Sequence, residues 1–446
     1  MALLRALTVL LLLLVASLPA MAQGAIRDDE TERYLRRLAD PLLEAAGLRP
    51  EDLRLFVLAD PRLNAFVAGG QNLFVFTGLI EAAETPEQLA GVIAHEIGHI
   101  AGGHLTRMVR AGERAGQQAL IGALLGIAAA VAGAPQLGTA AIVGSQGLAR
   151  QRMLTFTRAQ EQAADQAAVT YLSAVGMSPR GLLEVMELLD ARARGISGGG
   201  GEFLQTHPLT RDRIRFLESQ VTAAAADERP PDPALEAEHR RIVAKLVGFL
   251  APPQEALRRY RGKDFAARYA RAIALYRDLR FDESMRLLDE LLRERPEDPY
   301  LLELKGQFLF ERGRVAEAEP FYRKALALRP DSALVRVAFA RTLIEQDRPE
   351  LLPEARAALR EAIRLDRLYA PAYRLLGVVA GRLGDEGESF LALAEWAVLR
   401  HDRRDAELYL RRAEERIGPD DRDRIRLEDL RRAVAGMPEP QRTRRR

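Results

Sequence analysis

Two histidines and a glutamate stand together in one short motif of this chain. The motif is His95-Glu96-Ile97-Gly98-His99, in which the two imidazoles are four positions apart. On an α-helix, positions i and i+4 share one face, so both imidazoles can bind one metal ion. Glu96 lies further around the helix, where it can reach a metal-bound water as a general base. The motif predicts hydrolysis assisted by one Zn²⁺ per chain; the alternative is a pair of hydrogen-bonded core histidines.

A catalytic zinc needs three protein ligands and an open position for water, so a third ligand must come from elsewhere. His104 lies close, and Gly102 falls where the metzincin pattern has its glycine, but the last histidine of that pattern would fall on Leu105. Glu161 offers a carboxylate ligand instead, and Asp165 four residues later offers a second carboxylate to orient a histidine. Of these two candidates we favour Glu161.

A helix that begins at Pro86 must position the motif. Thr85 and Gln88 form a capping box, and Pro86 suits the first helical position. A buried stripe on this helix is predicted by the apolar residues Leu89, Val92, Ile93 and Ile100.

Length and composition limit the class of protein. The chain has 446 residues and a formal net charge of +2, which indicates two domains and argues against a nucleic-acid partner. The one basic cluster, Arg442 to Arg446, lies in a tail (436–446) that we expect to be disordered. The chain has no cysteine and therefore no disulfide.

The first 22 residues have the features of a cleavable signal peptide. Arg5 precedes an apolar run from Leu7 to Val15, and Ala20-Met21-Ala22 fits the rule for signal peptidase. The run is short for a membrane-spanning helix, which is the alternative, and polar sequence follows at once. We expect cleavage before Gln23 and export to the periplasm.

Beyond the signal peptide, the chain divides into two regions. Residues 23–222 mix helical periodicity with strand-like runs at Leu53 to Leu58 and Asn72 to Thr77, an α+β pattern that is mostly α. Prolines interrupt residues 223–258, which we interpret as a linker and a connecting helix.

Residues 259–435 show a helical repeat with a period of about 34 residues, seen when Pro296 is aligned on Pro330. Gly306, Ala318 and Tyr322 fit the small and large positions of a tetratricopeptide helix pair. We predict an all-α tetratricopeptide-repeat solenoid; a generic helical bundle is the alternative.

Three motifs together, His95 to His99, Glu161 to Asp165 and Thr206-His207-Pro208, resemble the HtpX-like and CAAX-prenyl-protease-like gluzincin peptidases. The resemblance implies that His95, His99 and Glu161 bind zinc, that Glu96 and Asp165 are catalytic, and that Asp165 supports a histidine. It also implies that His207 approaches the metal, either as a fourth ligand that latches the site or as a group that stabilises the oxyanion. The substrate-binding residues stay unknown.

The arrangement of an export signal, this peptidase domain and trailing repeats is similar to that of periplasmic family members in outer-membrane protein quality control. The likeness implies an exported endopeptidase that hydrolyses unfolded or misassembled outer-membrane proteins. It implies that the repeats bind the outer-membrane beta-barrel assembly machinery. The alternative function is a chaperone or assembly scaffold in which proteolysis is secondary.

Weaker signals leave further expectations. The run Asn72 to Phe76 resembles the family's edge strand, which pairs with an extended peptide; a plain buried strand is the alternative. For the apolar stretch 119–144, buried helices near the cleft and peripheral membrane contact are both open. His239 and His401 lie among charged residues, and we predict that both are surface histidines.

Overall fold

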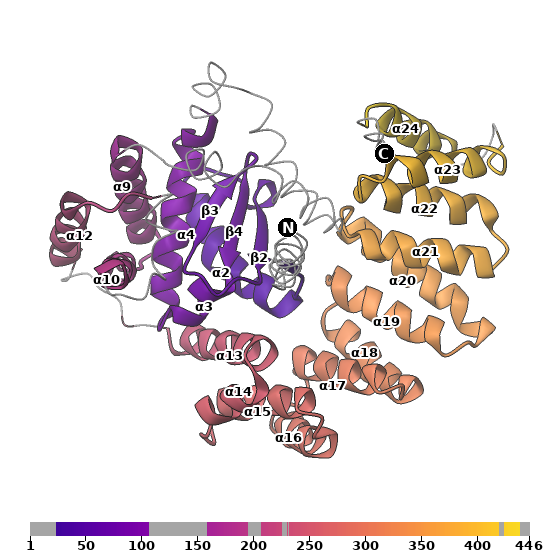
Figure 1. Ribbon diagram of the computed structural model, residues 1–446, viewed down its shortest axis with the longest axis horizontal. Coiled ribbons are helices and arrows are strands. Elements are labelled where there is room, and N and C mark those ends of the chain that lie inside the picture. Colours follow the sequence, from indigo (N-terminus) through magenta and orange to yellow (C-terminus); the bar gives the residue numbers. More distant parts are fainter. Residues whose placement is uncertain are drawn as a thin grey trace, which may run out of the picture.

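The computed structural model describes residues 24–106, 158–194, 207–224, 230, 232–418 and 423–437. The predicted signal peptide (1–22), the apolar stretch 119–144 and the basic cluster 442–446 lie outside these residues. The described chain is mainly helical, with one small sheet in its N-terminal region and helix pairs stacked beside it (Figure 1). The predicted class, α+β and mostly α followed by an all-α solenoid, is confirmed.

The sheet has four strands in the order β1-β2-β4-β3. Strand β2 (Arg54–Leu58) pairs antiparallel with β1 (Ala25–Ile26) and parallel with β4 (Asn72–Phe76). Strand β3 (Ala65–Ala68) pairs antiparallel with β4 on its other side. The edge-strand prediction for Asn72 to Phe76 is therefore wrong, because Gly69 and Gly70, both at positive φ, turn β3 back along it. The edge is β3.

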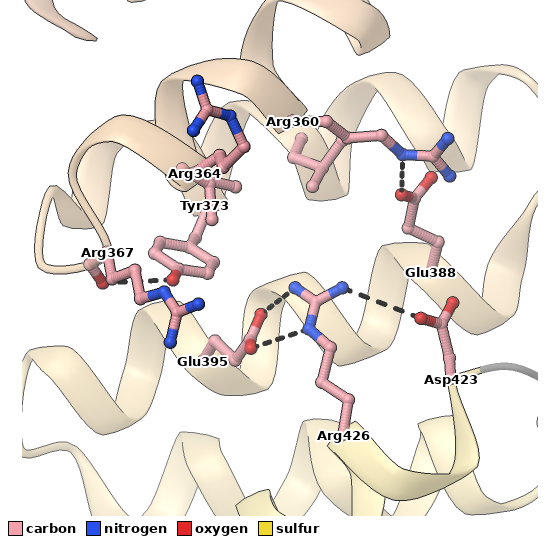
Figure 2. A pocket seen from close by; sticks show the side chains of 10 residues that line it. Arg360, Arg364, Arg367, Tyr373, Glu388, Glu395, Asp423 and Arg426 are labelled. Atoms are coloured by element: carbon pink, nitrogen blue, oxygen red, sulfur yellow. Dashed lines mark hydrogen bonds and ion pairs between the residues drawn. The ribbon is translucent and has the colours of Figure 1, made fainter.

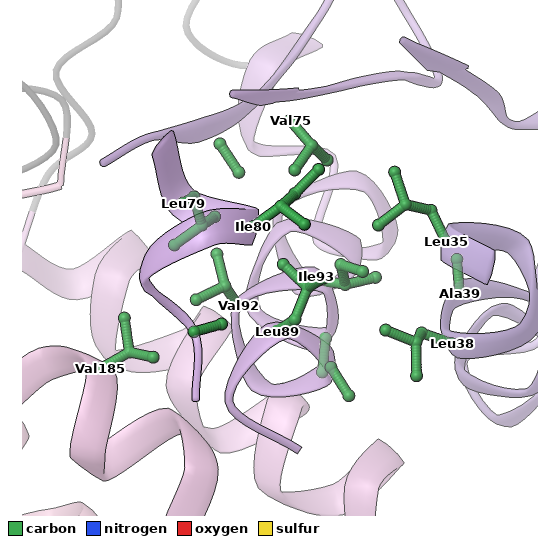
Figure 3. Packing of buried hydrophobic residues seen from close by; sticks show 14 of the residues in the cluster. Leu35, Leu38, Ala39, Val75, Leu79, Ile80, Leu89, Val92, Ile93 and Val185 are labelled. Atoms are coloured by element: carbon green, nitrogen blue, oxygen red, sulfur yellow. The ribbon is translucent and has the colours of Figure 1, made fainter. Parts of the chain in front are cut away.

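Helix α4 (Pro86–Ala101) lies at the centre of the N-terminal region and carries the histidine motif. Thr85 Oγ1 accepts a hydrogen bond of 3.3 Å from the Gln88 N–H, and this confirms the predicted start of the helix. One side of α4 packs on α2 (Asp29–Ala45), and Figure 3 shows Ile93 of α4 facing Leu35 and Leu38 across this contact. The remaining helices and 3-10 turns of this region are η1 (Pro50–Asp52), α3 (Thr77–Ala82), α9 (Arg158–Ala174), α10 (Arg180–Arg194) and α12 (Arg211–Ala224).

Two glycines of α4 let α9 and α10 approach closely. A Cβ atom at Gly91 would lie 2.6 Å from the backbone nitrogen of Leu182 on α10. A Cβ atom at Gly98 would lie 2.9 Å from the carbonyl oxygen of Ala164 on α9. Because Gly98 stands between the two histidines of the motif, this contact brings α9 directly against them.

Helices α13 (Pro233–Leu250) and α14 (Pro253–Arg259) connect the two regions. His239 on α13 is buried, with its Nε2 2.8 Å from the Ala83 carbonyl oxygen and its Nδ1 2.6 Å from the Tyr34 hydroxyl. The prediction of a surface position is wrong for His239, because α13 packs against α2 and α3 and turns the imidazole inward. A buried imidazole needs partners for both nitrogens, and His239 has them.

The repeat region consists of stacked helix pairs, in accordance with the predicted tetratricopeptide pattern. A Cβ atom at Gly306 would lie 3.0 Å from the Tyr322 ring, so this small and large pair sets the helix spacing. His401 is exposed, as predicted, at a turn with a φ of 56°. The elements are α15 (Phe265–Arg277), α16 (Phe281–Glu294), α17 (Pro299–Glu311), α18 (Val315–Leu328), α19 (Ala333–Glu345), η2 (Pro349–Leu351), α20 (Leu352–Leu365), α21 (Ala370–Arg382), α22 (Glu386–Leu399), α23 (Arg403–Glu414) and α24 (Arg424–Ala435).

Ion pairs join the repeat region to the start of α2. Arg27 and Arg33 lie 2.9 Å from Asp366 and Asp331, which stand in turns before α21 and α19. Lys245 of α13 pairs with Asp28, the residue that caps α2. In the described ranges, none of the helices has the length and apolar character needed to cross a membrane.

Candidate metal centre

Four buried side chains meet beside α4. His95 and His99 come from α4, Glu161 from the first turn of α9, and His207 from the segment that leads into α12. Each side chain has no measurable exposure, and one ligand atom from each lies within 4.8 Å of the others. The fold therefore brings together the three proposed ligands and His207, which are spread over more than a hundred residues of the sequence.

The separations between these atoms match the edges of a tetrahedral metal site. His95 Nε2 lies 3.1 Å from His99 Nε2 and 3.5 Å from Glu161 Oε2, and His99 Nε2 lies 3.4 Å from Glu161 Oε1. His207 Nδ1 lies 3.4 Å from His95 Nε2 and 3.2 Å from Glu161 Oε1. Metal–ligand bonds of about 2.0–2.1 Å in a tetrahedral site give ligand separations of about 3.3 Å. These residues thus fit a tetrahedral metal ion with nitrogen and oxygen donors.

The electrostatics of the centre also suit a cation. Burial alone would raise the pKa of the Glu161 carboxyl, but His207, His95 and His99 lower it well below its usual range. Burial would lower the pKa of His95, but hydrogen bonds from its ring to Asp165 and Glu161 raise it to about 9. The carboxylates therefore hold positive charge at this point of the interior, as a bound metal would require.

Asp165 contacts one proposed ligand, His95, but is not itself one of the four clustered side chains. Its Oδ1 lies 2.9 Å from His95 Nδ1, the ring nitrogen that points away from the other ligands. A hydrogen bond to this nitrogen fixes the ring so that Nε2 faces the metal position. Asp165 is thus placed to orient His95, which matches the supporting role expected of it, and it acts through that histidine.

Arg213 of α12 also belongs to the centre, although it was not predicted from the sequence. It donates through Nε and Nη2 to the two oxygens of Asp165, at 2.6 and 2.8 Å, and its Nη1 lies 2.7 Å from Glu161 Oε2. Its exposure is 1%, so it neutralises both carboxylates inside the protein. The sequence did contain a sign that this arginine is buried. It is followed at intervals of four by Leu217 and Val221, and the three residues form one buried stripe of α12.

Glu96 lies next to the four ligand atoms without belonging to them. Its carboxyl is buried, and burial is the main cause of a raised pKa. Its Oε1 lies 3.4 Å from His207 Nε2, and the backbone of Val67 on the edge strand β3 lies near enough to oppose the rise in its pKa. A carboxylate with a raised pKa is a stronger base, which suits it to accept a proton during catalysis.

His104, the rival third ligand, stands behind His99. Its Nδ1 lies 2.9 Å from His99 Nδ1, the nitrogen opposite to the one that faces Glu161. It is buried, and a Cβ atom at Gly102 would lie only 2.5 Å from its Nε2, so Gly102 makes room for the ring. This position allows His104 to orient His99 but places it outside the ligand cluster.

Comparison with known proteins gives matches for both regions. Residues 29–221 match the model of Peptidase family M48, and residues 254–299, 269–333 and 309–378 match models of the tetratricopeptide repeat. The beta-barrel assembly-enhancing protease of Yersinia pestis is 25% identical over 333 residues, which are 73% of this chain and 67% of that protein. The protein of the same name from Escherichia coli (strain K12) is 27% identical over 429 residues, 88% of this chain and 86% of the relative. The mitochondrial metalloendopeptidase OMA1 of Schizosaccharomyces pombe is 27% identical over 202 residues, 45% of this chain and 56% of the relative.

Proposed function

Because residues 29–221 form a Peptidase family M48 domain, we propose that this metallopeptidase is a zinc-dependent endopeptidase of misassembled or unfolded envelope proteins. The observation that carries the proposal is the buried cluster of His95, His99, Glu161 and His207 with Glu96 beside it. Two imidazoles and a carboxylate are a frequent ligand set of catalytic zinc.

In this proposal, His95, His99 and Glu161 hold the zinc ion. A zinc ion held there would supply Lewis-acid chemistry, polarising a scissile carbonyl and acidifying a water. Glu96 is placed to act as the general base that accepts a proton from an attacking water and returns it to the leaving amine. Asp165 orients His95, and Arg213 compensates the charge of the two carboxylates. The edge strand β3, whose Val67 contacts Glu96, is the place where an extended peptide would pair.

The repeat region and the relatives' names support the wider role. The relatives from Yersinia pestis and Escherichia coli are both named beta-barrel assembly-enhancing protease. We place this chain in the periplasm, with its repeats recruiting unfolded outer-membrane proteins or the machinery that assembles them. A chaperone or scaffold role is the second candidate, and the tetratricopeptide matches favour it as a complement to proteolysis.

Substrate trapping tests this function. The Glu96→Gln variant should retain bound polypeptides that the active enzyme would cleave, because it keeps the ligands and loses the base. We expect outer-membrane beta-barrel proteins among the molecules that mass spectrometry identifies, and cleavage of the same purified, unfolded proteins by the active enzyme. Trapped proteins that the active enzyme fails to cleave would speak against the proposal and in favour of a scaffold.

His207 is proposed as a latch on the resting enzyme. Its Nδ1 lies 3.4 Å from His95 Nε2 and 3.2 Å from Glu161 Oε1, and its Nε2 lies 3.4 Å from Glu96 Oε1. In this place His207 would compete with a water for an open position on the metal and would block the base. The segment that carries His207 must therefore move before a substrate can react.

The His207→Ala variant distinguishes a latch from a residue that stabilises the oxyanion. If His207 is a latch, His207→Ala should raise basal hydrolysis of a short peptide several-fold with zinc retained. If His207 instead stabilises the oxyanion, the same change should lower the rate by about a hundredfold or more. Peptide hydrolysis and zinc content at neutral pH decide between them, with His401→Ala as the control for loss of an exposed histidine.

A further inference from the structure

Two grooves open on the repeat region, each between the second helices of two successive helix pairs. The first, of about 550 Å³, lies between α16 and α18 with α17 beneath it. The second, of about 580 Å³, lies between α20 and α22 with α21 beneath it and the start of α24 beside it. We call them the first groove and the second groove.

The two grooves are equivalent places of the solenoid. Arg293, Pro296 and Leu302 line the first groove, and residues whose numbers are higher by 71 line the second. An interval of 71 residues corresponds to two repeats of about 34 residues plus the short insertion that contains η2. The remaining equivalent lining pairs are Asp289 and Arg360, Leu292 and Ile363, Lys305 and Leu376, and Lys324 and Glu395.

The repeat between the grooves carries different side chains at the corresponding place. Arg323 and Phe339 stand there, one repeat after Asp289 and Lys305. The Arg323 guanidinium lies over the Phe339 ring, 4.8 Å from its centre, and donates to Glu354 on α20. Arg323 is therefore engaged with its neighbours on α19 and α20.

The first groove has an apolar floor and a rim of three cations and one carboxylate, Asp289, which pairs with Lys305. Leu302 and Phe321 form much of the floor, and the Lys305 ammonium lies 4.5 Å from the centre of the Phe321 ring. At the rim, the Lys324 ammonium donates to the backbone oxygen of Pro296 at 2.8 Å, and Arg293 is exposed. Within the described ranges, no ion pair joins Arg293 or Lys324 to a carboxylate.

The second groove is lined by four arginines and three carboxylates (Figure 2). Buried Glu388 accepts from Arg360 at 2.6 Å, and Glu395 accepts from Arg426, so two guanidinium groups are fixed at the groove. Arg364, the equivalent of Arg293, pairs only with a neighbour on its own helix, Glu361, and is two-thirds exposed. Exposed pairs of this kind contribute little and exchange easily for another carboxylate.

We propose that the two grooves bind an extended segment of a partner polypeptide that carries acidic side chains next to apolar ones. An apolar side chain of such a segment fits the floors, which Leu302 and Phe321 form in one groove and Ile363 and Leu376 in the other. Its carboxylates meet the cations at the rims, Arg293 with Lys324 and Arg364 with Arg367. This inference deepens the recruiting role proposed for the repeats, and it needs no contribution from the metal centre.

The spacing of the grooves sets the length of the segment. With about 10 Å between packed helices of successive repeats, the grooves are roughly 20 Å apart, the length of about six extended residues. A single segment with two acidic and apolar anchors at this interval would therefore reach both grooves and bind more tightly than a segment with one anchor.

Binding of labelled peptides to the full-length Glu96→Gln protein tests the proposal without cleavage. The probe is a fluorescein-labelled peptide with two Glu-Phe pairs about six residues apart, and the matched peptides carry Gln-Phe or Lys-Phe pairs instead. We expect the Glu-Phe peptide to bind most tightly and the Lys-Phe peptide least. Arg293→Glu and Arg364→Glu should each weaken its affinity roughly threefold to tenfold, and the double variant more than either.

Arg404→Glu is the control, because Arg404 is exposed on α23 outside both grooves. It should leave the affinity of the Glu-Phe peptide unchanged. Equal affinities for the Glu-Phe and Gln-Phe peptides, or equal losses in the groove variants and in Arg404→Glu, would overturn the proposal. A loss confined to one groove would overturn the equivalence of the two. Far-ultraviolet circular dichroism of each variant shows that its helices are intact. If the activity on outer-membrane proteins failed while this binding held, only the proposed function would be lost.

Discussion

Glu96→Gln is expected to reduce the rate of peptide hydrolysis by a factor of about 10² to 10⁴ and to leave the zinc content unchanged. The two effects separate because Glu96 stands beside the four ligand atoms and is not one of them. Glutamine has nearly the same shape as glutamate, but it cannot accept the proton of the attacking water. Single-turnover hydrolysis of a short peptide, with zinc measured by elemental analysis on the same sample, provides both numbers.

Glu87→Gln is the matched control for this experiment. Glu87 is also a glutamate of α4, in the first turn of the helix and away from the ligand cluster, so Glu87→Gln should leave the rate and the zinc content as they are. If Glu96→Gln kept the full rate with zinc bound, another group would have to act as the base. If it lost zinc as well, Glu96 would have to contribute to metal binding.

The sequence predicted the elements of the site well where the signal is local. Thr85, Pro86 and Gln88 act within one helical turn, so capping rules located the start of α4. The spacing of His95 and His99 on that helix then placed both imidazoles on one face. These inferences need only helix geometry, and tertiary structure leaves them unchanged.

Glu161 and His207 were a harder case, because their approach to the histidines depends on packing between distant segments. Helix geometry offered Glu161 as a carboxylate donor, and only the resemblance to a family implied that His207 approaches the metal. The contact of Gly98 with Ala164 explains the approach of α9, but a glycine in a sequence does not say which helix will lie against it. Nothing local could have put these four side chains in one place.

The missed residues are charged or polar groups inside the protein. His239 was predicted to lie on the surface because it stands among charged residues in the sequence, and no role was predicted for Arg213. Each is buried with partners from other elements, Arg213 with Asp165 and Glu161, and His239 with Tyr34 and Ala83. Burial of a polar group becomes predictable only when its partners are known, and these come from elsewhere in the chain.

Glu161→Ala is expected to release zinc from the folded protein and thereby to abolish hydrolysis. The change removes one of three proposed ligands, and it also removes one of the two carboxylates that neutralise Arg213. A buried guanidinium with a single carboxylate partner then faces the metal position, which disfavours a divalent cation further. Glu161→Gln keeps the volume of the side chain and removes its charge, so it reports on zinc binding if the alanine variant fails to fold.

His104→Ala is the decisive comparison for this prediction, since His104 was the rival third ligand. From its place behind His99, its loss should weaken zinc binding by about 10- to 100-fold, as the loss of an orienting partner does, and leave the metal bound at ordinary zinc concentrations. Competition with a chelator of known affinity measures both variants on one scale. If the His104 variant lost zinc and the Glu161 variant kept it, His104 would be the third ligand. Loss of a direct ligand should lower the zinc affinity more than loss of a residue that only orients a ligand.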